Sequence, residues 1–488
     1  MKRPRTLGAL RATGYSSRSV RSELRANLIA RLRAGDNVFP GVVGFDRTVV
    51  PQIHNAILSG HDFVLLGLRG QAKTRLLRAL PALLDEAVPY VAGTTLREDP
   101  LQPITAATRA RIEREGDDLA IDWLEREERY HEKLATPDVS IADLVGDVDP
   151  IKAATLKRAL DDPEVIHYGL LPRSNRGLFA INELPDLQPR IQVALFNVLE
   201  EGDLQIRGFP LRLPLDVLLL FSANPEDYTN RGNIITPLRD RIASQILTHY
   251  PRSIAESLAI TEQEAWTARG DEFDVQLPEW LAETIERVAF RARESELVDA
   301  NSGVSARMTI ALRENVVSNA ERRALLAGST QAVARVADMF TALPAITGKI
   351  ELVYEGEREG PQKVAQKLIG EALGEVFQAR FASALEPRTE GGEDNDIAPI
   401  VAWFSSRNTI DIEDDLADDA LLERLKDVPA LRTVAEQALT PKAPGELAAA
   451  MEFVLEGLAE AGLVSKSERV SGATFRDSFE DLIKGFSA

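Results

Sequence analysis

The sequence predicts an α/β protein with a parallel sheet, followed by a mainly helical second half. Between residues 42 and 250, short apolar segments alternate with stretches of helical length, which is typical of a parallel sheet covered on both faces. After residue 251 only helical segments follow. The composition of 44% apolar, 27% charged and 6% aromatic residues agrees with a largely helical soluble protein of more than one domain. No stretch reaches the roughly 18 apolar residues of a membrane helix, so we expect no membrane span.

The first 40 residues are predicted to form a basic N-terminal arm. Lys and Arg far outnumber the acidic residues there, from Lys2 to Arg33. We interpret this segment as a partly helical arm that docks on a neighbouring acidic surface.

Residues 41–250 are predicted to form the α/β domain. The expected strands are Asp62–Leu66, Gly177–Ile181 and Asp216–Ser222, and the expected helices are Lys73–Ala87 and Gln188–Glu200. A charged insertion, about residues 94–136, separates the first two strands. Its second half is predicted to be an exposed helix.

Residues 251–345 are predicted to form a helical lid domain, and residues 346–488 a mainly helical C-terminal region. The lid helices are expected at Ile254–Ala268, Pro278–Arg293, Arg307–Leu326 and Thr330–Leu343. An acidic segment containing two glycines, about residues 386–396, is expected to be a linker in the C-terminal region.

The segment Gly67–Thr74 lies between an apolar strand and a helix and reads Gly-Leu-Arg-Gly-Gln-Ala-Lys-Thr. This is the context of a P-loop, in which backbone N–H groups surround a phosphate at the start of a helix. Lys73 is predicted to reach the β- and γ-phosphates of ATP, and the Thr74 hydroxyl to bind Mg²⁺. The nucleotide-binding residues are expected to be Gly67, Leu68, Arg69, Gly70, Gln71, Ala72, Lys73, Thr74 and Arg75.

Ala72 departs from this pattern, because a glycine usually precedes the lysine. An alanine fits the loop without strain only if its φ angle is negative. Its cost in stability is therefore either near zero or on the order of 1 kcal/mol.

A second motif is the apolar segment Gly177–Ile181, which ends in a polar pair, Asn182-Glu183. A buried strand that delivers a carboxylate beside the γ-phosphate supplies a base for the attacking water, and Glu183 fits that role. Asn182 stands where an aspartate normally binds Mg²⁺ through water. Its amide oxygen can accept from metal-bound water but carries no charge, so slow turnover is an open alternative.

Two further segments complete the candidate site. Asn224 follows the third predicted strand, where its amide can contact the γ-phosphate or the water. Arg239 and Arg241 stand between that strand and the lid, and an arginine there can reach a neighbouring subunit's site and neutralise transition-state charge. Taken alone, this Arg-Asp-Arg turn reads as a surface ion-pair cluster.

The order of these elements resembles the AAA+ superfamily of ATPases. The segments Val145–Asp149, Gly169–Leu178 and Glu201–Pro210 resemble one branch, the magnesium chelatase I subunit and its MoxR relatives; the last of them reads as a β-hairpin. The resemblance covers about residues 40–345 of the chain.

This resemblance implies roles for further residues. Val43 and Gly44 match the segment near the adenine, Arg241 matches the arginine finger, and Arg307 matches a second sensor arginine. It also implies ATP and Mg²⁺ as cofactors, a homo-oligomeric ring that is a hexamer in the family, and a partner protein with a von Willebrand A domain.

The net charge and the absence of cysteine argue against several other functional classes of protein. A net charge of -19 disfavours nucleic acid as the partner, although a nucleic-acid motor remains a third reading. The absence of cysteine excludes thiol nucleophiles, disulfides and zinc-thiolate sites and is compatible with a cytoplasmic protein. The leading interpretation is an ATP-hydrolysing ring motor that remodels a partner protein, and the alternative is a nucleotide-gated assembly scaffold with weak or no hydrolysis.

Overall fold

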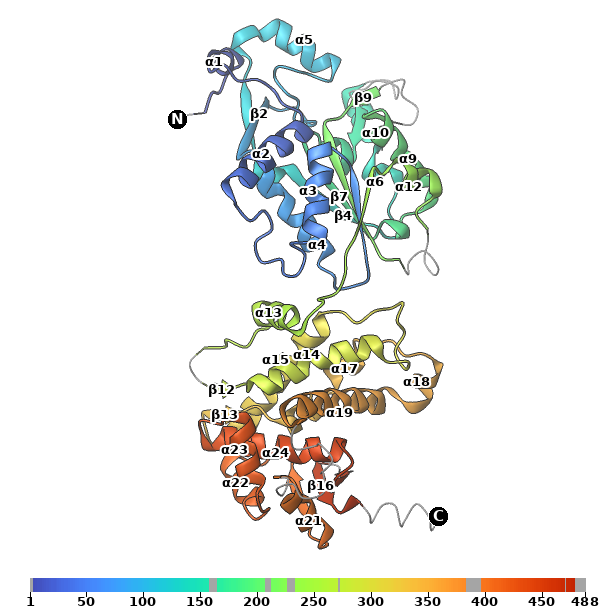
Figure 1. Ribbon diagram of the computed structural model, residues 1–488. Coiled ribbons are helices and arrows are strands. Elements are labelled where there is room, and N and C mark those ends of the chain that lie inside the picture. Colours follow the sequence, from blue (N-terminus) through green and yellow to red (C-terminus); the bar gives the residue numbers. More distant parts are fainter. Residues whose placement is uncertain are drawn as a thin grey trace. The chain divides into compact units, whose positions relative to one another are not determined.

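The computed structural model describes residues 3–157, 165–206, 212–225, 233–270, 273–382, 396–469 and 471–478. The chain divides into two compact units, Met1–His249 and Tyr250–Ala488 (Figure 1). Within the described ranges, no helix is long and apolar enough to cross a membrane.

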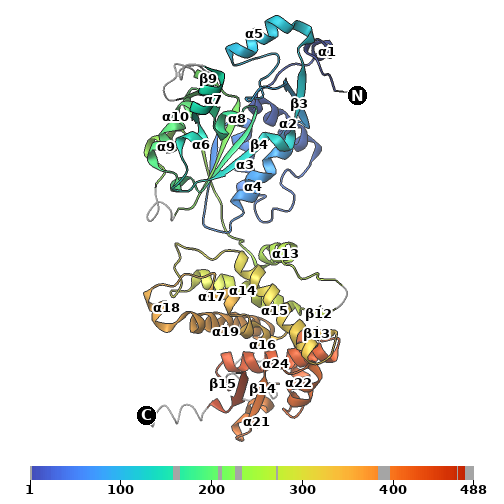
Figure 2. The ribbon, with the colours of Figure 1, turned by 180° about the vertical axis from the view of Figure 1, so that it is seen from behind.

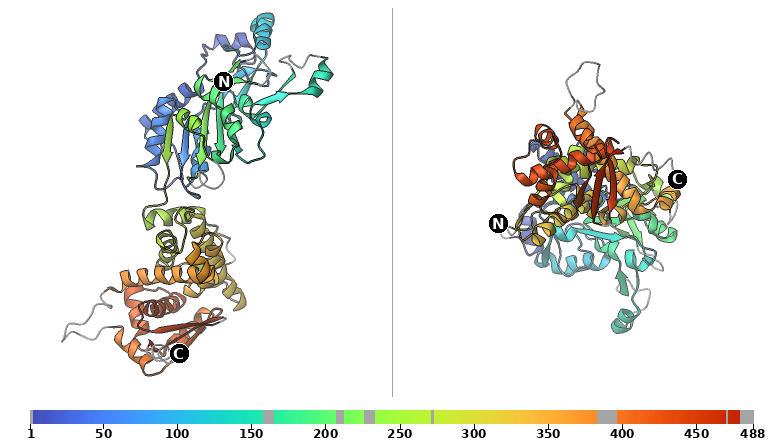
Figure 3. Two further views of the ribbon diagram at one scale, coloured as in Figure 1. Left: turned by 90° about the vertical axis from the view of Figure 1, so that its right-hand side faces the viewer. Right: turned by 90° about the horizontal axis from the view of Figure 1, so that it is seen from below.

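The first unit contains a five-stranded parallel sheet with the order β11-β1-β10-β7-β4. The strands are β1 (Phe63–Leu66), β4 (Tyr130–Leu134), β7 (Gly177–Asn182), β10 (Val217–Ala223) and β11 (Ser244–Leu247). The predicted α/β class is therefore confirmed, and β1, β7 and β10 are the strands expected from their apolar sequences. Figure 3 shows them side by side, with helices on both faces.

Helices cover both faces of this sheet because successive strand residues point to opposite sides. In β1, Phe63 and Leu65 pack in the core beneath α2, α3 and α4, whereas Val64 packs in the core on the other face. Figure 1 shows these two sets of helices on either side of the sheet. The first face carries α2 (Val20–Ala34), α3 (Val49–Ser59) and α4 (Lys73–Ala79), and the second α6 (Ile141–Leu144), α8 (Leu170–Arg173), α9 (Pro189–Ala194), α10 (Phe196–Glu200) and α12 (Thr236–Arg241).

The prediction for the second half of the charged insertion is wrong. Instead of an exposed helix it forms β3 (Ile121–Glu125), which pairs with β2 (Ala87–Val91), and β4, the edge strand of the main sheet. The insertion's helix, α5 (Ala106–Glu115), lies earlier. An edge strand tolerates charged side chains because only one side of it is paired and much of it faces solvent. The predicted helix from Lys73 to Ala87 is also too long, since α4 ends at Ala79 before a 3₁₀ turn.

The basic N-terminal segment is helical and packs on its own unit. Its helices are α1 (Leu7–Ala12) and α2, whose apolar residues enter the core. Figure 2 shows α1 beside α5. The side chain of Glu23 is 3% exposed and pairs with Arg129, which is 1% exposed, at 2.6 Å. Exposed pairs such as Arg11 with Asp117 join it to acidic residues of the insertion.

Two further strand pairings lie in the described part of the first unit. β5 (Gly146–Val148) pairs with β6 (Ile166–Tyr168), and α7 (Pro150–Leu156) follows β5. β8 (Asp203–Gln205), in the segment read as a hairpin, pairs antiparallel with β9 (Arg212–Pro214), which follows that segment. Residues 207–210 of that segment lie outside the described residues.

The second unit begins with three of the expected helices, α13 (Ile254–Glu264), α14 (Glu279–Glu294) and α15 (Arg307–Leu326). The fourth predicted helix is wrong in its first part. Gln331–Val333 forms β13, which pairs with β12 (Asp274–Gln276), and only then does α16 (Val336–Thr341) begin. The chain continues with α17 (Pro344–Thr347), α18 (Tyr354–Glu359), α19 (Pro361–Arg380), α21 (Ala398–Ser405), β14 (Ile410–Glu413), α22 (Asp418–Leu425), α23 (Leu431–Leu439), α24 (Pro444–Glu460), β15 (Ser465–Arg469) and β16 (Gly472–Arg476).

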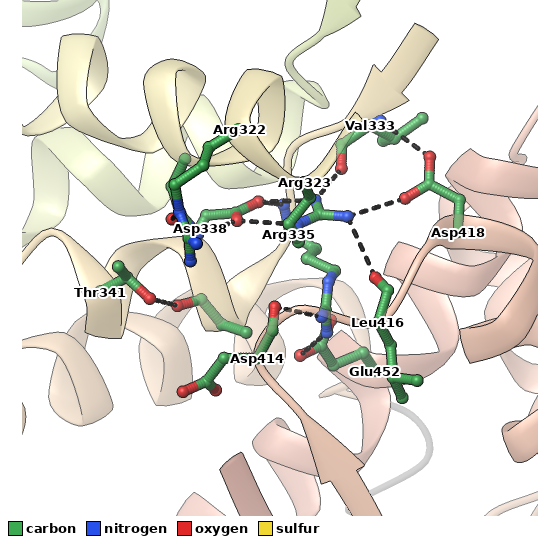
Figure 4. Close-up of polar contacts among 12 residues, drawn as sticks. Arg322, Arg323, Val333, Arg335, Asp338, Thr341, Asp414, Leu416, Asp418 and Glu452 are labelled. Atoms are coloured by element: carbon green, nitrogen blue, oxygen red, sulfur yellow. Dashed lines mark hydrogen bonds and ion pairs between the residues drawn. The ribbon is translucent and has the colours of Figure 1, made fainter. Parts of the chain in front are cut away.

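A single hydrophobic core runs through this unit, from Trp280 to Phe475. Buried ion pairs join α15 and α16 to the later elements: Arg323 contacts Asp338 and Asp418 at 2.9 Å each, and Arg335 contacts Glu452 at 2.9 Å (Figure 4). The predicted lid domain and C-terminal region, which were expected to divide near residue 345, therefore pack together around one core. The predicted acidic linker lies, up to residue 395, outside the described residues.

Candidate nucleotide site

The loop Gly67–Thr74 connects the carboxyl end of β1 to the first residues of α4. Gly70 adopts a positive φ of 74°, which glycine tolerates without a steric penalty. A Cβ atom at Gly67 would overlap the side-chain oxygens of Thr248 and Gln71. The two glycines are thus required for different reasons, one for conformation and one for space.

Ala72 has a φ of 54° and a ψ of 16°, the left-handed conformation, immediately before α4. The condition for an unstrained alanine is therefore not met. A non-glycine residue in this region costs about 1–2 kcal/mol. The strain lies in the loop that is the candidate phosphate site.

The side chain of Lys73 is held at the mouth of the loop. The residue is 6% exposed, and its Nζ donates to the carbonyl oxygens of Gly67 and Leu68. It also donates to the Oδ1 atom of Asn224 at 2.6 Å. The other end of that amide, Nδ2, donates to Glu183 Oε2 at 2.9 Å.

These three side chains form a continuous chain of hydrogen bonds from Lys73 through Asn224 to Glu183. They follow three adjacent strands: Asn224 and Glu183 come directly after β10 and β7, and Lys73 begins α4 after the loop that follows β1. The ends of neighbouring parallel strands are where ligands bind in open α/β sheets. The structure thus brings together a cation, an amide and a carboxylate that are far apart in the sequence.

The backbone at the end of β7 directs Glu183 toward the site and Asn182 into the sheet. Asn182 is 8% exposed, and its Oδ1 accepts from the hydroxyl of Ser222 at 3.0 Å. Glu183 turns away from the strand with a φ of 56°, another left-handed residue. Its backbone N–H donates to the same hydroxyl at 3.4 Å.

Val43 and Gly44 lie in a segment that contacts the end of β11. Phe45 packs edge-on against His249 with 5.0 Å between ring centres, and the Thr48 hydroxyl is 2.7 Å from His249 Nε2. The preceding residue, Thr248, donates its hydroxyl to Gln71 at 2.7 Å. This connects the Val43 segment to the P-loop through the end of β11.

Thr248 was missed by the sequence reasoning. It is 8% exposed and contacts both Leu66 and Gln71, so it supports the entrance of the loop. The signal that identified Asn224, a polar residue just after an apolar strand, also applies here. The strand itself, Ser-Gln-Ile-Leu, is too short and mixed to stand out.

The predicted arginines are not part of this hydrogen-bonded chain. Arg241 ion-pairs with Glu200 at 2.8 Å, and its guanidinium lies 4.7 Å from the centre of the Phe196 ring. Arg239 is exposed on the same helix, α12. Arg307 belongs to the second unit, where it is exposed at the first turn of α15.

The remaining predicted residues lie in or beside the loop. Leu68, Arg69 and Thr74 are half-buried, and Arg75 is exposed on α4. The oxygen atoms of Thr74 and Asn182 are chemically suited to Mg²⁺ and its bound water. No group of three or more histidine or acidic side chains suited to a metal ion occurs among the described residues, so a metal here would depend on phosphate oxygens as well.

No protein-family model matches the chain. It is similar to the magnesium-chelatase 38 kDa subunit of Cereibacter sphaeroides, with 28% identity over 253 residues that cover 51% of this chain and 69% of that protein. The corresponding subunit of Rhodobacter capsulatus is 25% identical over 249 residues, or 50% of this chain and 63% of that one.

Among solved structures, the chain is similar to a model of the complex between the BchI and BchD subunits of magnesium chelatase. The identity is 21%, the TM-score is 0.34, and the match covers 66% of this chain and 98% of that one. The fold assignment does not depend on this likeness, because it follows from the strand order described above. In its motifs, and over about half of its length, the chain is thus similar to AAA+ ATPases of the magnesium chelatase I kind.

Proposed function

We propose that this protein is an ATP-hydrolysing ring motor that resembles the magnesium chelatase ATPase subunit and MoxR proteins and remodels or activates a partner protein. The observation that supports it most strongly is the hydrogen-bonded chain from Lys73 through Asn224 to Glu183 at the end of the sheet. It joins a phosphate-binding cation to a carboxylate suited to activating water.

In this proposal the loop Gly67–Thr74 binds the phosphates of ATP. Its backbone N–H groups and the first turn of α4 favour negative charge. Lys73 exchanges loop carbonyls for phosphate oxygens, a shift that requires no movement of α4 since its Nζ already lies at the loop. Thr74 and Asn182 would hold Mg²⁺, which neutralises phosphate charge when bound.

Glu183 accepts the proton of the attacking water, and Asn224 orients the Glu183 carboxylate. An amide that donates to one carboxylate oxygen fixes the orientation of the carboxylate beside the loop. The same amide contacts Lys73 with its carbonyl oxygen. Phosphate binding at Lys73 is thereby coupled to the position of the base.

The proposed ring is inferred from Arg241, which as an arginine finger would reach the nucleotide of a neighbouring subunit. Its ion pair with Glu200 is on the surface, where such pairs contribute only about 0–1 kcal/mol, so the arginine can move to a neighbouring subunit's phosphate at little cost. Arg239 and, from the second unit, Arg307 are proposed to add further positive charge. The family suggests a hexamer and a partner with a von Willebrand A domain. The 38 kDa relatives are named for magnesium chelatase, but nothing in this chain indicates a porphyrin.

A second candidate is a nucleotide-gated scaffold that assembles with ATP and hydrolyses it weakly or not at all. The observation that favours it is Asn182, which is neutral at a position where an acid usually assists Mg²⁺. In addition, its Oδ1 is already bonded to Ser222.

Steady-state phosphate release by the purified protein separates the two candidates. The motor predicts release that Glu183→Gln and Arg241→Ala abolish, while ATP binding is retained. The scaffold predicts ATP-dependent assembly with release no greater than that of Lys73→Ala. Sedimentation with a slowly hydrolysed ATP analogue measures the assembly in the same samples.

A further inference from the structure

A pocket of about 320 Å³ lies in the second unit, between α16, α24 and the three-stranded sheet β14-β16-β15. Phe340 of α16 and Phe475 of β16 contribute aromatic walls. Figure 3 shows the three strands, in dark red, beside the helices of this unit. The volume is at the lower end of the range of small-ligand sites.

One of the carboxylates that line the pocket has a buried oxygen without a hydrogen-bond partner. Glu452 of α24 is 2% exposed and lines the pocket. Its Oε1 accepts from Arg335 at 2.9 Å, as Figure 4 shows, whereas no described residue donates to its Oε2. The Nη2 atom of Arg335 donates to the backbone carbonyls of Glu413 and Asp414, and its Nε is a second buried atom without a partner among the described residues.

An unsatisfied buried acceptor is costly, and buried polar groups in proteins nearly always have a partner. The missing partner of Glu452 is a hydrogen-bond donor. Because the acceptor is a carboxylate, a positively charged donor would bind more strongly than a neutral one.

The same pocket already accommodates one ammonium group, that of Lys466 on β15. Its Nζ lies 2.9 Å from the buried carboxylate of Glu456 and 3.9 Å from the centre of the Phe340 ring. An ammonium between a carboxylate and an aromatic face is a recurrent mode of cation recognition. This chain's own lysine therefore shows which chemistry the pocket accepts.

The carboxylates of the pocket outnumber the cations that compensate them. Asp414, Glu452, Glu456 and Glu468 line it, against Lys466 and Arg469 in the lining and Arg335 paired with Glu452. Arg469 also pairs with Asp411 outside the lining, and Gln366 donates to Glu468. Burial raises the pKa of Glu456 to about 7 even though Lys466 opposes this, and burial raises the pKa of Asp414. A further cation would reduce this excess of negative charge.

We propose that this pocket binds a primary alkylammonium group, which donates to Glu452 Oε2 and extends its alkyl chain along Phe340 and Phe475. The group belongs either to a small amine or to a lysine side chain of a partner protein, since both present the same chemistry. The site lies wholly in the second unit and does not depend on the nucleotide proposal.

The test is ligand-observed NMR on the full chain, with pentylammonium chloride as the probe and 1-pentanol as its neutral counterpart. We expect saturable binding of pentylammonium and none of pentanol. Glu452→Gln should weaken binding roughly tenfold or more. Glu423→Gln removes an exposed carboxylate of α22 and should leave binding unchanged.

Two additional arms complete the design. Ala473→Leu fills the pocket while leaving the Arg335–Glu452 pair intact, so it should abolish binding even if Glu452→Gln proves unstable. A peptide with a single lysine, compared with its norleucine counterpart, distinguishes a protein ligand from a small amine. Absence of saturable pentylammonium binding, equal binding of pentanol, or equal loss in Glu423→Gln would overturn the proposal.

Discussion

The left-handed Ala72 in the P-loop predicts that a glycine at this position stabilises the first unit. Replacing Ala72 relieves a strain of about 1–2 kcal/mol. The new glycine costs about 0.5–1 kcal/mol through the greater conformational freedom of the unfolded chain. The net expectation is a gain of up to about 1.5 kcal/mol in the free energy of unfolding.

The matched control is Ala79→Gly, at the last residue of the same helix. Ala79 has a φ of -82°, so glycine there relieves no strain and only adds the cost in the unfolded chain. That cost cancels between the two variants. Their difference in stability should therefore equal the strain itself, about 1–2 kcal/mol in favour of Ala72→Gly.

The assay is hydrogen exchange of the slowest amides of β1 and β10, which report the opening of the first unit rather than of the whole chain. Exchange in Ala72→Gly should be slower than in Ala79→Gly by a factor of about 5–30. If both variants accelerate exchange equally, Ala72 is not strained and the conformation assigned to the loop is wrong.

Four further predictions concern Asn182 and Asn224 at the candidate site and Arg323 and Glu456 in the second unit. Asn182→Asp should raise the rate of phosphate release, because it adds a charge near the metal; an unchanged rate would mean that this position does not limit turnover. Asn224→Ala should lower that rate more than it weakens ATP binding, since it breaks both the Lys73 and the Glu183 contacts; equal losses would contradict its orienting role. Arg323→Ala should destabilise the second unit by about 3–5 kcal/mol in urea unfolding, because it leaves the buried carboxylate of Asp338 without its cation. A loss of stability below about 1 kcal/mol would be typical of a surface pair instead. Burial raises the pKa of Glu456 from 4.5 to about 7, so between these pH values the unfolded chain loses this proton more readily than the folded chain. The native chain therefore loses stability as the pH rises from about 5 to about 8, and Glu456→Gln should gain stability relative to it. A difference in urea midpoint that stays constant with pH would argue against this.

The sequence identified the parts of the fold that have a strong local signal. β1, β7 and β10 are apolar and central, and the P-loop glycines mark the turn between β1 and α4. The P-loop motif identified Lys73 and the strand ends identified Asn224 and Glu183, and the structure brings these three residues into one hydrogen-bonded chain.

The elements that were mispredicted owe their conformation to distant partners. β4 has the sequence Tyr-His-Glu-Lys-Leu, whose charges suggest an exposed helix, and it is a strand because β7 lies beside it. β13 occupies the start of a predicted helix because β12 pairs with it. The pairing of Glu23 with Arg129 joins residues 106 positions apart, so no local sequence pattern could predict it.

Calorimetric titration of the full chain with ATP and Mg²⁺ tests most directly whether Lys73 and its loop bind ATP. We expect saturable binding by the native chain, binding retained in Glu183→Gln, and binding lost in Lys73→Ala. Equal binding by the native chain and Lys73→Ala, or no binding by either, would contradict the account.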